Sequence, residues 1–298
     1  MSFEDNDVFA TGLVLHIDAD TIAYGQCCVN NEDDDIDRGL IAKGMRRKMN
    51  SLMIAAGCDS FVCFLTTKTN FRDDLVDDYK GNRANVERPV NLNWAKNYLV
   101  KNFDCRFQDK LEADDLLGIE SGPGTVIWSI DKDLRQVPGL HLDENTGQVI
   151  EITEEGTLKD LGKKIYFDGL AGFYFQCLTG DTTDNIVGCG KRVSAKYKSG
   201  AKAGETYWKR QGIGPKKALK ILQDAEDSML DAVIHEYKEL HGEDWQVNLE
   251  TQANLLFMVR EKHGVIIRRW TYDDREEYFD LIKGEILDGY HPEAAGSR

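Results

Sequence analysis

The sequence predicts an α/β fold with a mainly parallel central sheet and helices on both faces, followed by a helical C-terminal region. Short apolar runs alternate with segments of helical periodicity up to about residue 165. The runs are almost continuously apolar, which is typical of parallel strands buried on both faces. From about residue 167 onward the pattern is almost wholly helical, with no convincing strand.

The predicted elements follow one another in a regular order. Strands are expected at residues 12–17, 60–65, 105–108 and 125–130. Helices are expected through the apolar positions of 41–56 and 92–99, and from residue 113. A turn signal beside alternating residues at 144–155 predicts a small hairpin. Later helices are expected at 173–178 and 255–260.

Length and composition indicate a globular protein of two domains. The chain has 298 residues, 41% of them hydrophobic and only five of them proline. We place the domain boundary between residues 168 and 169. No run approaches the roughly 20 apolar residues of a membrane span, and the N-terminus is acidic, so we expect a cytoplasmic protein without membrane contact. Seven cysteines without a C-x-x-C pair predict reduced thiols rather than disulfides or a thiolate zinc site.

Basic residues are concentrated in one segment of an acidic chain. The net charge is −15, from 52 acidic and 37 basic residues. Residues 191–220 nevertheless contain ten Lys or Arg and one acid, Glu205. Such a basic segment predicts contact with a polyanion, although a solvated surface is the ordinary alternative.

Carboxylates follow the ends of several predicted elements, in four groups: Asp18 and Asp20; Glu112, Asp114 and Asp115; Asp131 and Asp133; Asp181 and Asp184. The first three groups should meet at the carboxyl edge of a parallel sheet, where they would repel one another without cations. Oxygen ligands favour Mg²⁺ or Mn²⁺, and two such ions about 4 Å apart suit attack of water on a phosphodiester. Individually, Asp114 and Asp115 could instead complement a helix dipole, and Asp133 or Asp184 could be an N-cap.

Two further segments carry residues suited to phosphate. Gly212 and Gly214 precede an apolar helix with Lys216 and Lys217 in its first turn, which is a helix-hairpin-helix signature. A simple Gly-Pro turn is the alternative. In the connection after residue 65, four basic residues and one tyrosine could grip a phosphate backbone and stack on a base: Arg72, Tyr79, Lys80, Arg83 and Arg88. The alternative there is an exposed polar loop.

Together these residues resemble the flap endonuclease family of structure-specific 5′-nucleases. The likeness is strongest to the 5′→3′ exonucleases of tailed bacteriophages, and includes the 5′-nuclease domain of bacterial DNA polymerase I. The matching segments occur in the family's order over about 200 residues: 14–20, 79–83, 111–115, 129–133, 179–186 and 212–218.

The resemblance implies a role for each group. It implies an α/β nuclease domain at 1–168, with an arch at about 67–100, and a helical DNA-binding region at 169–298, with the helix-hairpin-helix motif at about 185–222. One metal is assigned to Asp18, Glu112 and Asp114, and the second to Asp131, Asp133 and Asp181, with Asp115 and Asp184 acting often through water. Lys80 and Arg83 would contact the scissile phosphate and Tyr79 would stack on a base. Gly212–Ala218 would hold duplex DNA, often with K⁺.

Three positions depart from the family's pattern. Thr67 stands where the family commonly has an aspartate, and Ala19 where glycine is usual. A lysine-rich insert, which includes Lys191 and Arg192, separates Gly188 from Gly212 where relatives run on almost directly. We expect the insert to be a flexible DNA-gripping loop.

The resemblance therefore predicts a divalent-metal-dependent 5′→3′ exonuclease and flap endonuclease with a two-metal mechanism. It implies RNA-primer removal and DNA degradation during phage replication in the host cytoplasm. DNA with 5′ ends or flaps would be the substrate, with RNA–DNA hybrids, a replication polymerase or a single-strand-binding protein as further partners. Two alternatives stay open. One is a DNA-binding protein whose catalysis has lapsed, which Thr67 motivates. The other is an aspartyl-phosphate phosphatase using Asp18, which leaves residues 112–115 unexplained.

Overall fold

A computed structural model describes residues 11–83, 86–196, 198–200, 204–226 and 228–288. The described residues form two compact units. Unit 1 comprises those within Met1–Thr67, Glu87–Leu134 and Pro138–Ile152, and unit 2 comprises those within Lys68–Val86, Arg135–Val137 and Thr153–Arg298. These units describe packing alone, so the division at residues 168 and 169 into nuclease and DNA-binding regions stays a prediction.

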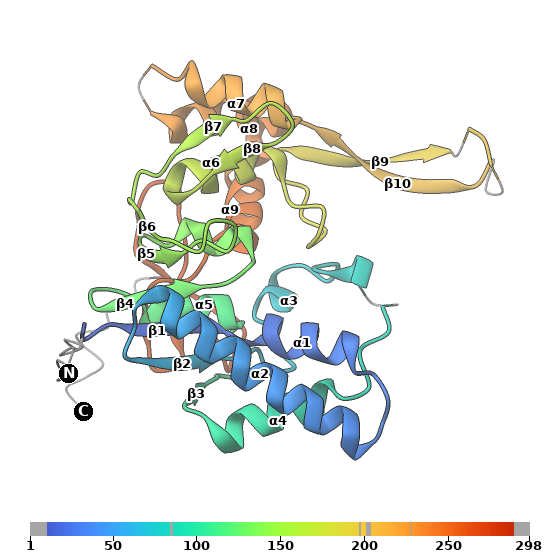
Figure 1. Cartoon of the computed structure of the whole chain (residues 1–298). Helices are drawn as coiled ribbons and strands as arrows, with labels where there is room; N and C mark the ends of the chain where they lie inside the picture. The colour runs from blue at the N-terminus through green and yellow to red at the C-terminus, as the bar shows by residue number, and fades with distance from the viewer. Residues whose placement is uncertain (1–10, 84–85, 197, 201–203, 227, 289–298) are drawn as a thin grey trace, which may run out of the picture. The chain divides into compact units, whose positions relative to one another are not determined.

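Unit 1 is built on a six-stranded sheet with the order β3-β2-β1-β4-β5-β6 (Figure 1). All neighbouring strands are parallel except β5 and β6. The strands are β1 (Val14–Asp18), β2 (Ser60–Phe64), β3 (Cys105–Arg106), β4 (Thr125–Trp128), β5 (Gly139–Leu142) and β6 (Val149–Ile152). The sheet confirms the predicted α/β class. The hairpin expected at 144–155 is the antiparallel pair β5–β6, but its first strand, β5, lies before that range.

Helices cover both faces of this sheet. They are α1 (Ala19–Val29), α2 (Asp35–Ala56), α4 (Leu92–Asn102) and α5 (Ala113–Glu120), and the short 3₁₀ helix η2 (Lys132–Gln136) follows β4. Leu15 and Ile17 of β1 are buried in a core with residues of α1, α2 and α4. His16 points to the opposite face because side chains alternate along a strand, and its Nδ1 lies 3.0 Å from Ser121 Oγ at the end of α5. Helix α1 had no counterpart in the sequence prediction.

Unit 2 has a helical core. Its helices are α3 (Arg72–Leu75), η1 (Gly81–Arg83), α6 (Gly169–Thr179), α7 (Pro215–Gln223), α8 (Met229–His241), η3 (Gly242–Asp244) and α9 (Trp245–Leu256). Phe173 and Tyr237 are completely buried in this core, and the Tyr237 hydroxyl donates to the Cys177 carbonyl at 2.9 Å. Helix α9 ends at Leu256, so the prediction of helix at 255–260 is wrong for its last four residues.

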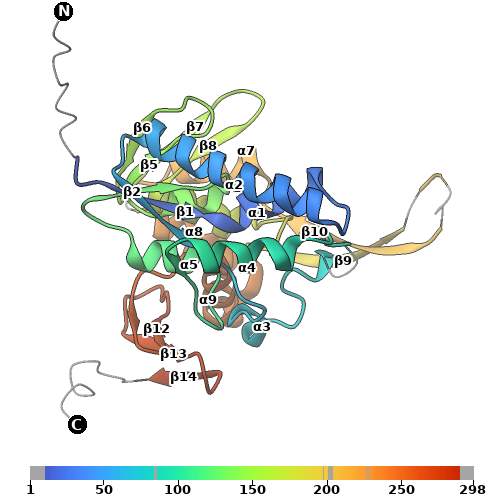
Figure 2. The ribbon, with the colours of Figure 1, turned by 60° about the horizontal axis from the view of Figure 1, so that its bottom comes forward.

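The prediction that the C-terminal half lacks strands is also wrong. Unit 2 contains three small antiparallel sheets: β7 (Leu158–Asp160) with β8 (Ile165–Phe167); β9 (Gly190–Lys196) with β10 (Thr206–Gly212); and the four strands β11 (Lys262–His263), β12 (Ile266–Arg268), β13 (Glu277–Asp280) and β14 (Glu285–Asp288), three of which are labelled in Figure 2. Most of these strands have four residues or fewer, too few for a hydrophobic period to emerge. β9 and β10 are longer but polar.

The sequence also predicted reduced cysteines and no membrane-spanning segment. All seven cysteines lie within the described residues and are free thiols, as predicted. Among the described residues, no helix has the length and apolar character needed to cross a bilayer.

Candidate active site

Asp18 lies at the junction of β1 and α1 in unit 1. It is the N-cap of α1, where its side chain accepts hydrogen bonds from the backbone amides of Asp20 and Thr21. Only 4% of Asp18 is exposed. Burial, and the neighbouring Asp20 carboxylate, raise the pKa of Asp18 to about 7. A bound cation would favour the ionised form of this carboxylate.

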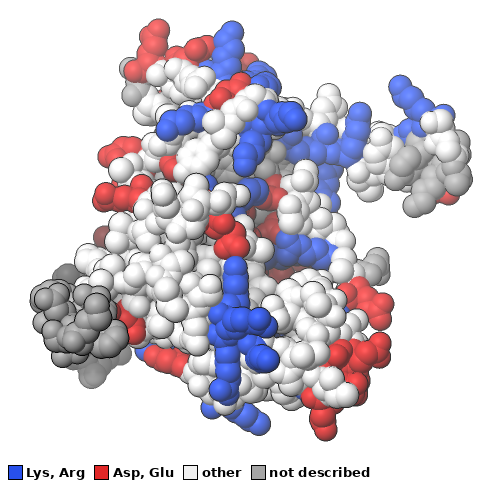
Figure 3. Space-filling view, viewed as in Figure 1, with Lys and Arg blue, Asp and Glu red and all other residues white. Residues whose placement is uncertain are grey.

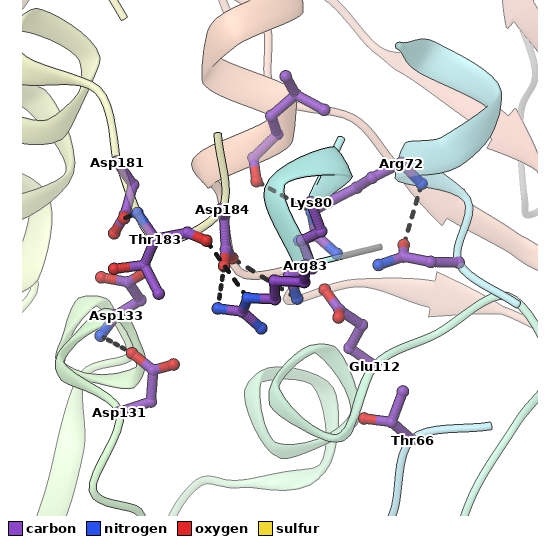
Figure 4. Close-up of polar contacts among 12 residues, drawn as sticks. Thr66, Arg72, Lys80, Arg83, Glu112, Asp131, Asp133, Asp181, Thr183 and Asp184 are labelled. Carbon is purple, nitrogen blue, oxygen red and sulfur yellow. Dashed lines mark hydrogen bonds and ion pairs between the residues drawn. The ribbon is translucent and has the colours of Figure 1, made fainter. Parts of the chain in front are cut away.

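Ser129 connects the end of β1 with the loop after β4. Its hydroxyl donates to Asp18 Oδ2 at 2.8 Å and accepts from the Asp131 amide at 3.0 Å. Asp131 Oδ1 in turn accepts from the Asp133 amide at 2.9 Å (Figure 4). The adjacent carboxyl ends of two parallel strands thus bring Asp18, Asp131 and Asp133 to one edge of the sheet, as the sequence predicted.

Thr66, just after β2, connects the same edge with α5. Its amide donates to Asp20 Oδ2 at 2.8 Å, and its hydroxyl accepts from the Ala113 amide at 3.0 Å. Lys96 of α4 donates to the Thr66 carbonyl at 2.9 Å and lies 2.7 Å from Asp20 Oδ1. Sequence analysis assigned no role to Thr66 and Lys96, or to Ser129 within the matching segment 129–133, because residues that only position an acid have no chemical pattern of their own.

Glu112, Asp114 and Asp115 lie at the start of α5. Glu112 is the N-cap, and its side chain and that of Asp115 form a capping box. The Glu112 amide donates to Asp115 Oδ2 at 3.2 Å, and Asp115 is completely buried. The sequence did not predict this capping role for Glu112 and Asp115, which fixes both acids beside the segment that Thr66 connects to the sheet edge.

The donor chemistry at this edge fits a hard divalent cation, because its acids offer carboxylate oxygens and Asp18 is buried with a raised pKa. The residues that the structure describes hold no group of three or more Asp, Glu, His or Cys side chains already arranged around a metal position.

Residues Asp78–Arg83 and Asp181–Ile186 are bonded together within unit 2. Arg83 donates to Asp184 Oδ1 at 2.5 Å, and Lys80 Nζ lies 3.5 Å from Asp184 Oδ2 (Figure 4). Lys80 has a φ of 52°, in the left-handed region, and its amide donates to the Asp184 carbonyl at 3.0 Å. Asp181 is 5% exposed and accepts from the Thr183 amide at 2.6 Å. The structure thus brings the predicted Lys80, Arg83 and Asp184 together.

Two predicted DNA contacts need correction. Arg72 is 1% exposed, and its guanidinium donates to the carbonyls of Leu255 and Phe257 at 3.0 and 2.8 Å. Tyr79 is 8% exposed and packs in the core of unit 2, with Lys80 Nζ 5.0 Å from its ring centre. Both side chains are buried and packed within unit 2, so neither is exposed to a phosphate or a base.

The glycine-rich segment leads into α7 from a strand. Gly214 is the N-cap of α7, and Lys216 and Lys217 are exposed in its first turn, 2.6 Å from Asp160 and 3.2 Å from Glu236. The preceding element is β10, so a helix-hairpin-helix motif is not shown. At Gly212 a β-carbon would lie 2.5 Å from the Cys189 carbonyl oxygen, which requires glycine for close packing of the backbone.

Among the described residues, the lysine-rich insert forms an antiparallel ribbon of β9 and β10 where a loop was expected. Lys191 is exposed in β9, and Arg192 pairs with Asp78 and donates to the Asn185 carbonyl at 2.9 Å. Residues 197 and 201–203 of the insert lie outside the described residues.

The chain has the fold of 5′-nucleases. The 5′-exonuclease of bacteriophage T5 with bound zinc superposes with a TM-score of 0.52 at 16% identity, over 82% of this chain and 86% of that one. The T5 flap endonuclease in a pseudo-enzyme–product complex with DNA and metal ions gives 0.51, with the same identity and coverage. The predicted resemblance is confirmed by these structures.

Sequence comparison gives a second relative. DNA polymerase I of Geobacillus stearothermophilus is 24% identical over 213 residues, which are 67% of this chain and 21% of the polymerase. The chain thus spans about a fifth of that relative's length. No known protein-family profile matches the chain.

Proposed function

We propose that this chain is a divalent-metal-dependent 5′-nuclease that hydrolyses phosphodiester bonds of DNA, as a 5′→3′ exonuclease and flap endonuclease. The main support is the sheet edge of unit 1, where Ser129 and Thr66 connect acids from two strand ends and the start of α5. This arrangement occurs in a fold whose solved examples include T5 5′-nucleases with bound metal ions.

The proposed metal ligands are the eight acids of the resemblance. Asp18, Glu112 and Asp114 would hold one Mg²⁺ or Mn²⁺, and Asp131, Asp133 and Asp181 the other, with Asp115 and Asp184 acting through water. Two such ions supply an activated water and stabilise the charge on the leaving oxygen. The chain's own contribution is to hold the carboxylates in place: Ser129 orients Asp18, and the α5 capping box orients Glu112.

Lys80 and Arg83 would bind the scissile phosphate. In the structure, the Asp184 carboxylate forms ion pairs with Lys80 at 3.5 Å and with Arg83 at 2.5 Å. A phosphate can take the place of this carboxylate, because a guanidinium binds either anion with two parallel hydrogen bonds. Asp184 therefore orients the pair before substrate arrives.

The substrate would be DNA with 5′ ends or flaps, and RNA–DNA hybrids if the chain removes primers during phage replication in the host cytoplasm. The proposed duplex-binding segment is Gly212–Ala218, with Lys191, Arg192, Lys216 and Lys217 around it and K⁺ as an additional ion. A replication polymerase or single-strand-binding protein would be a partner in that role.

The test is cleavage of a 5′-labelled flap duplex with Mg²⁺ or Mn²⁺, with EDTA as the control. We expect metal-dependent release of short 5′ fragments, whose length separates exonuclease from flap cutting. Asp131→Asn should abolish cleavage while DNA binding in Ca²⁺ stays within about twofold. Preserved cleavage would remove Asp131 from the proposed ligands.

A DNA-binding protein with lapsed catalysis is the second candidate. Thr67 stands in place of an acid, and its hydroxyl is buried without a hydrogen-bond partner among the described residues. Binding of the flap without cleavage, under either metal, would favour this candidate.

A further inference from the structure

The basic ribbon of β9 and β10 is the most unusual surface of unit 2. Its strands pair over seven residues each, from Gly190↔Gly212 to Lys196↔Thr206. They contain five Lys or Arg and no acid, in a chain of net charge −15. Figure 3 shows Lys and Arg gathered along the ribbon, which extends from the helices of its own unit in Figure 1. Charge complementarity therefore favours a polyanionic partner.

The base of the ribbon is fixed to unit 2. Arg210 donates to the carbonyls of Val187 and Leu178 at 2.5 and 2.8 Å, and Arg192 pairs with Asp78. Both arginines therefore bind other residues of unit 2, whereas Lys191, Lys196 and Lys209 are exposed. A fixed base holds the exposed side chains at defined positions.

The Trp208 side chain is exposed and does not contribute to the packing of the core. It is 70% exposed and lies outside the core of unit 2. It pairs with Ser194 across the ribbon, so it shares a face with Lys196, the diagonal neighbour about 7–8 Å away. At the ribbon's base, Trp208 also lines a pocket with Arg192, Lys209 and Asn185. An exposed indole is unfavourable in water, because its apolar surface stays hydrated.

We propose that Trp208 stacks on an unpaired base of a DNA strand that lies along the ribbon, while Lys196, on the same face of the ribbon, contacts a phosphate beside that base. This inference rests on the proposed function, since it names a contact for the substrate of that nuclease. An aromatic ring beside a cation is a sequence-tolerant binding surface for single strands. In a continuous duplex, neighbouring base pairs cover the faces of each base, so a single strand or the open end of a flap fits better.

Equilibrium binding of fluorescein-labelled DNA in Ca²⁺ tests this contact. A thymidine 20-mer and a 5′-flap duplex are compared with a blunt duplex, for the wild type, Trp208→Ala and Trp208→Phe. We expect Trp208→Ala to weaken binding of the single strand and the flap about tenfold and of the blunt duplex less than twofold. Trp208→Phe should restore affinity to within about threefold. The slope of log Kd against log salt should not change, because no charge is removed.

Equal weakening for all three DNAs, or no weakening, would overturn the inference. Thermal unfolding of both variants should match the wild type, since the side chain is exposed. Metal-dependent cleavage of the flap by the wild type is measured in parallel. Cleavage without a Trp208 effect would overturn this inference alone, whereas a selective Trp208 effect without cleavage would support the surface and count against the nuclease.

Discussion

Charged side chains gather at the sheet edge of unit 1 and on the ribbon of unit 2. The two surfaces differ in how many of these side chains are hydrogen-bonded within the protein. At the sheet edge, Asp18 and Asp20 accept hydrogen bonds from Ser129 and Thr66. On the ribbon, Lys191, Lys196 and Lys209 are exposed, and only the two arginines are bonded to the body of unit 2. Because a buried charge must be satisfied internally, its position is fixed, whereas an exposed charge stays available to a ligand. We therefore expect substitutions at the sheet edge to change metal binding and stability. Substitutions on the ribbon should change the affinity for DNA and its dependence on salt.

The largest effect is expected for Glu112→Gln, with Glu120→Gln as a matched control at the other end of α5, about 12 Å along the helix. Glutamine can still cap the helix, so folding should be preserved while the charge at the metal edge is lost. We expect flap cleavage to fall at least 100-fold, beyond the range of about 10–100-fold typical of outer-shell partners. The Glu120 variant should cleave normally; similar losses in both variants would exclude a specific role for Glu112.

Arg210 and Lys209 are neighbours on the ribbon with different expected functions. Arg210→Gln should lower the free energy of unfolding by about 2 kcal/mol, since two bonds from a charged donor to backbone carbonyls are lost. Lys209→Gln should change it by less than about 0.5 kcal/mol, yet weaken DNA binding across sequences and reduce the salt slope by about 0.9. Urea unfolding and anisotropy at several salt concentrations measure the two effects. An unchanged salt slope for Lys209→Gln would remove it from the phosphate contacts.

Ser129→Ala tests whether the connection between Asp18 and Asp131 prepares the metal site. We expect Mn²⁺ affinity, measured by calorimetry, to fall about tenfold because two acids lose their common hydrogen-bond partner. Ser60→Ala, exposed at the first position of β2, is the control. Unaltered Mn²⁺ affinity in Ser129→Ala would show that the two acids are held by other contacts.

The smallest effect is expected for Lys216→Gln. Its ion pair with Asp160 is exposed, so the free energy of unfolding should stay close to that of the wild type. The salt slope of duplex binding should nevertheless decrease by about 0.9, as for one lost phosphate contact. Lys101→Gln, on the exposed last turn of α4, is the control and should leave the slope unchanged. A slope like that of the control would show that the start of α7 does not touch DNA.

The central sheet was predictable because β1, β2 and β4 are compact apolar runs between helical segments. The acids at its carboxyl edge were predictable for the same reason, since parallel strands end together. Arg72 and Tyr79 were predicted wrongly because a basic and an aromatic residue beside a loop have the same sequence pattern in a core as on a surface. The C-terminal strands were missed because short, polar strands have no period to detect.

By itself, the sequence determined the α/β class, the order of the main elements and the grouping of the acids, because hydrophobic periodicity and motif spacing are local properties of the chain. Only the tertiary structure decided that Ser129 and Thr66 connect these acids, that Arg72 is buried, and that the lysine-rich insert is a ribbon exposing Trp208. Each of those outcomes depends on contacts with residues distant in the sequence, and such contacts leave little trace in the residues on either side.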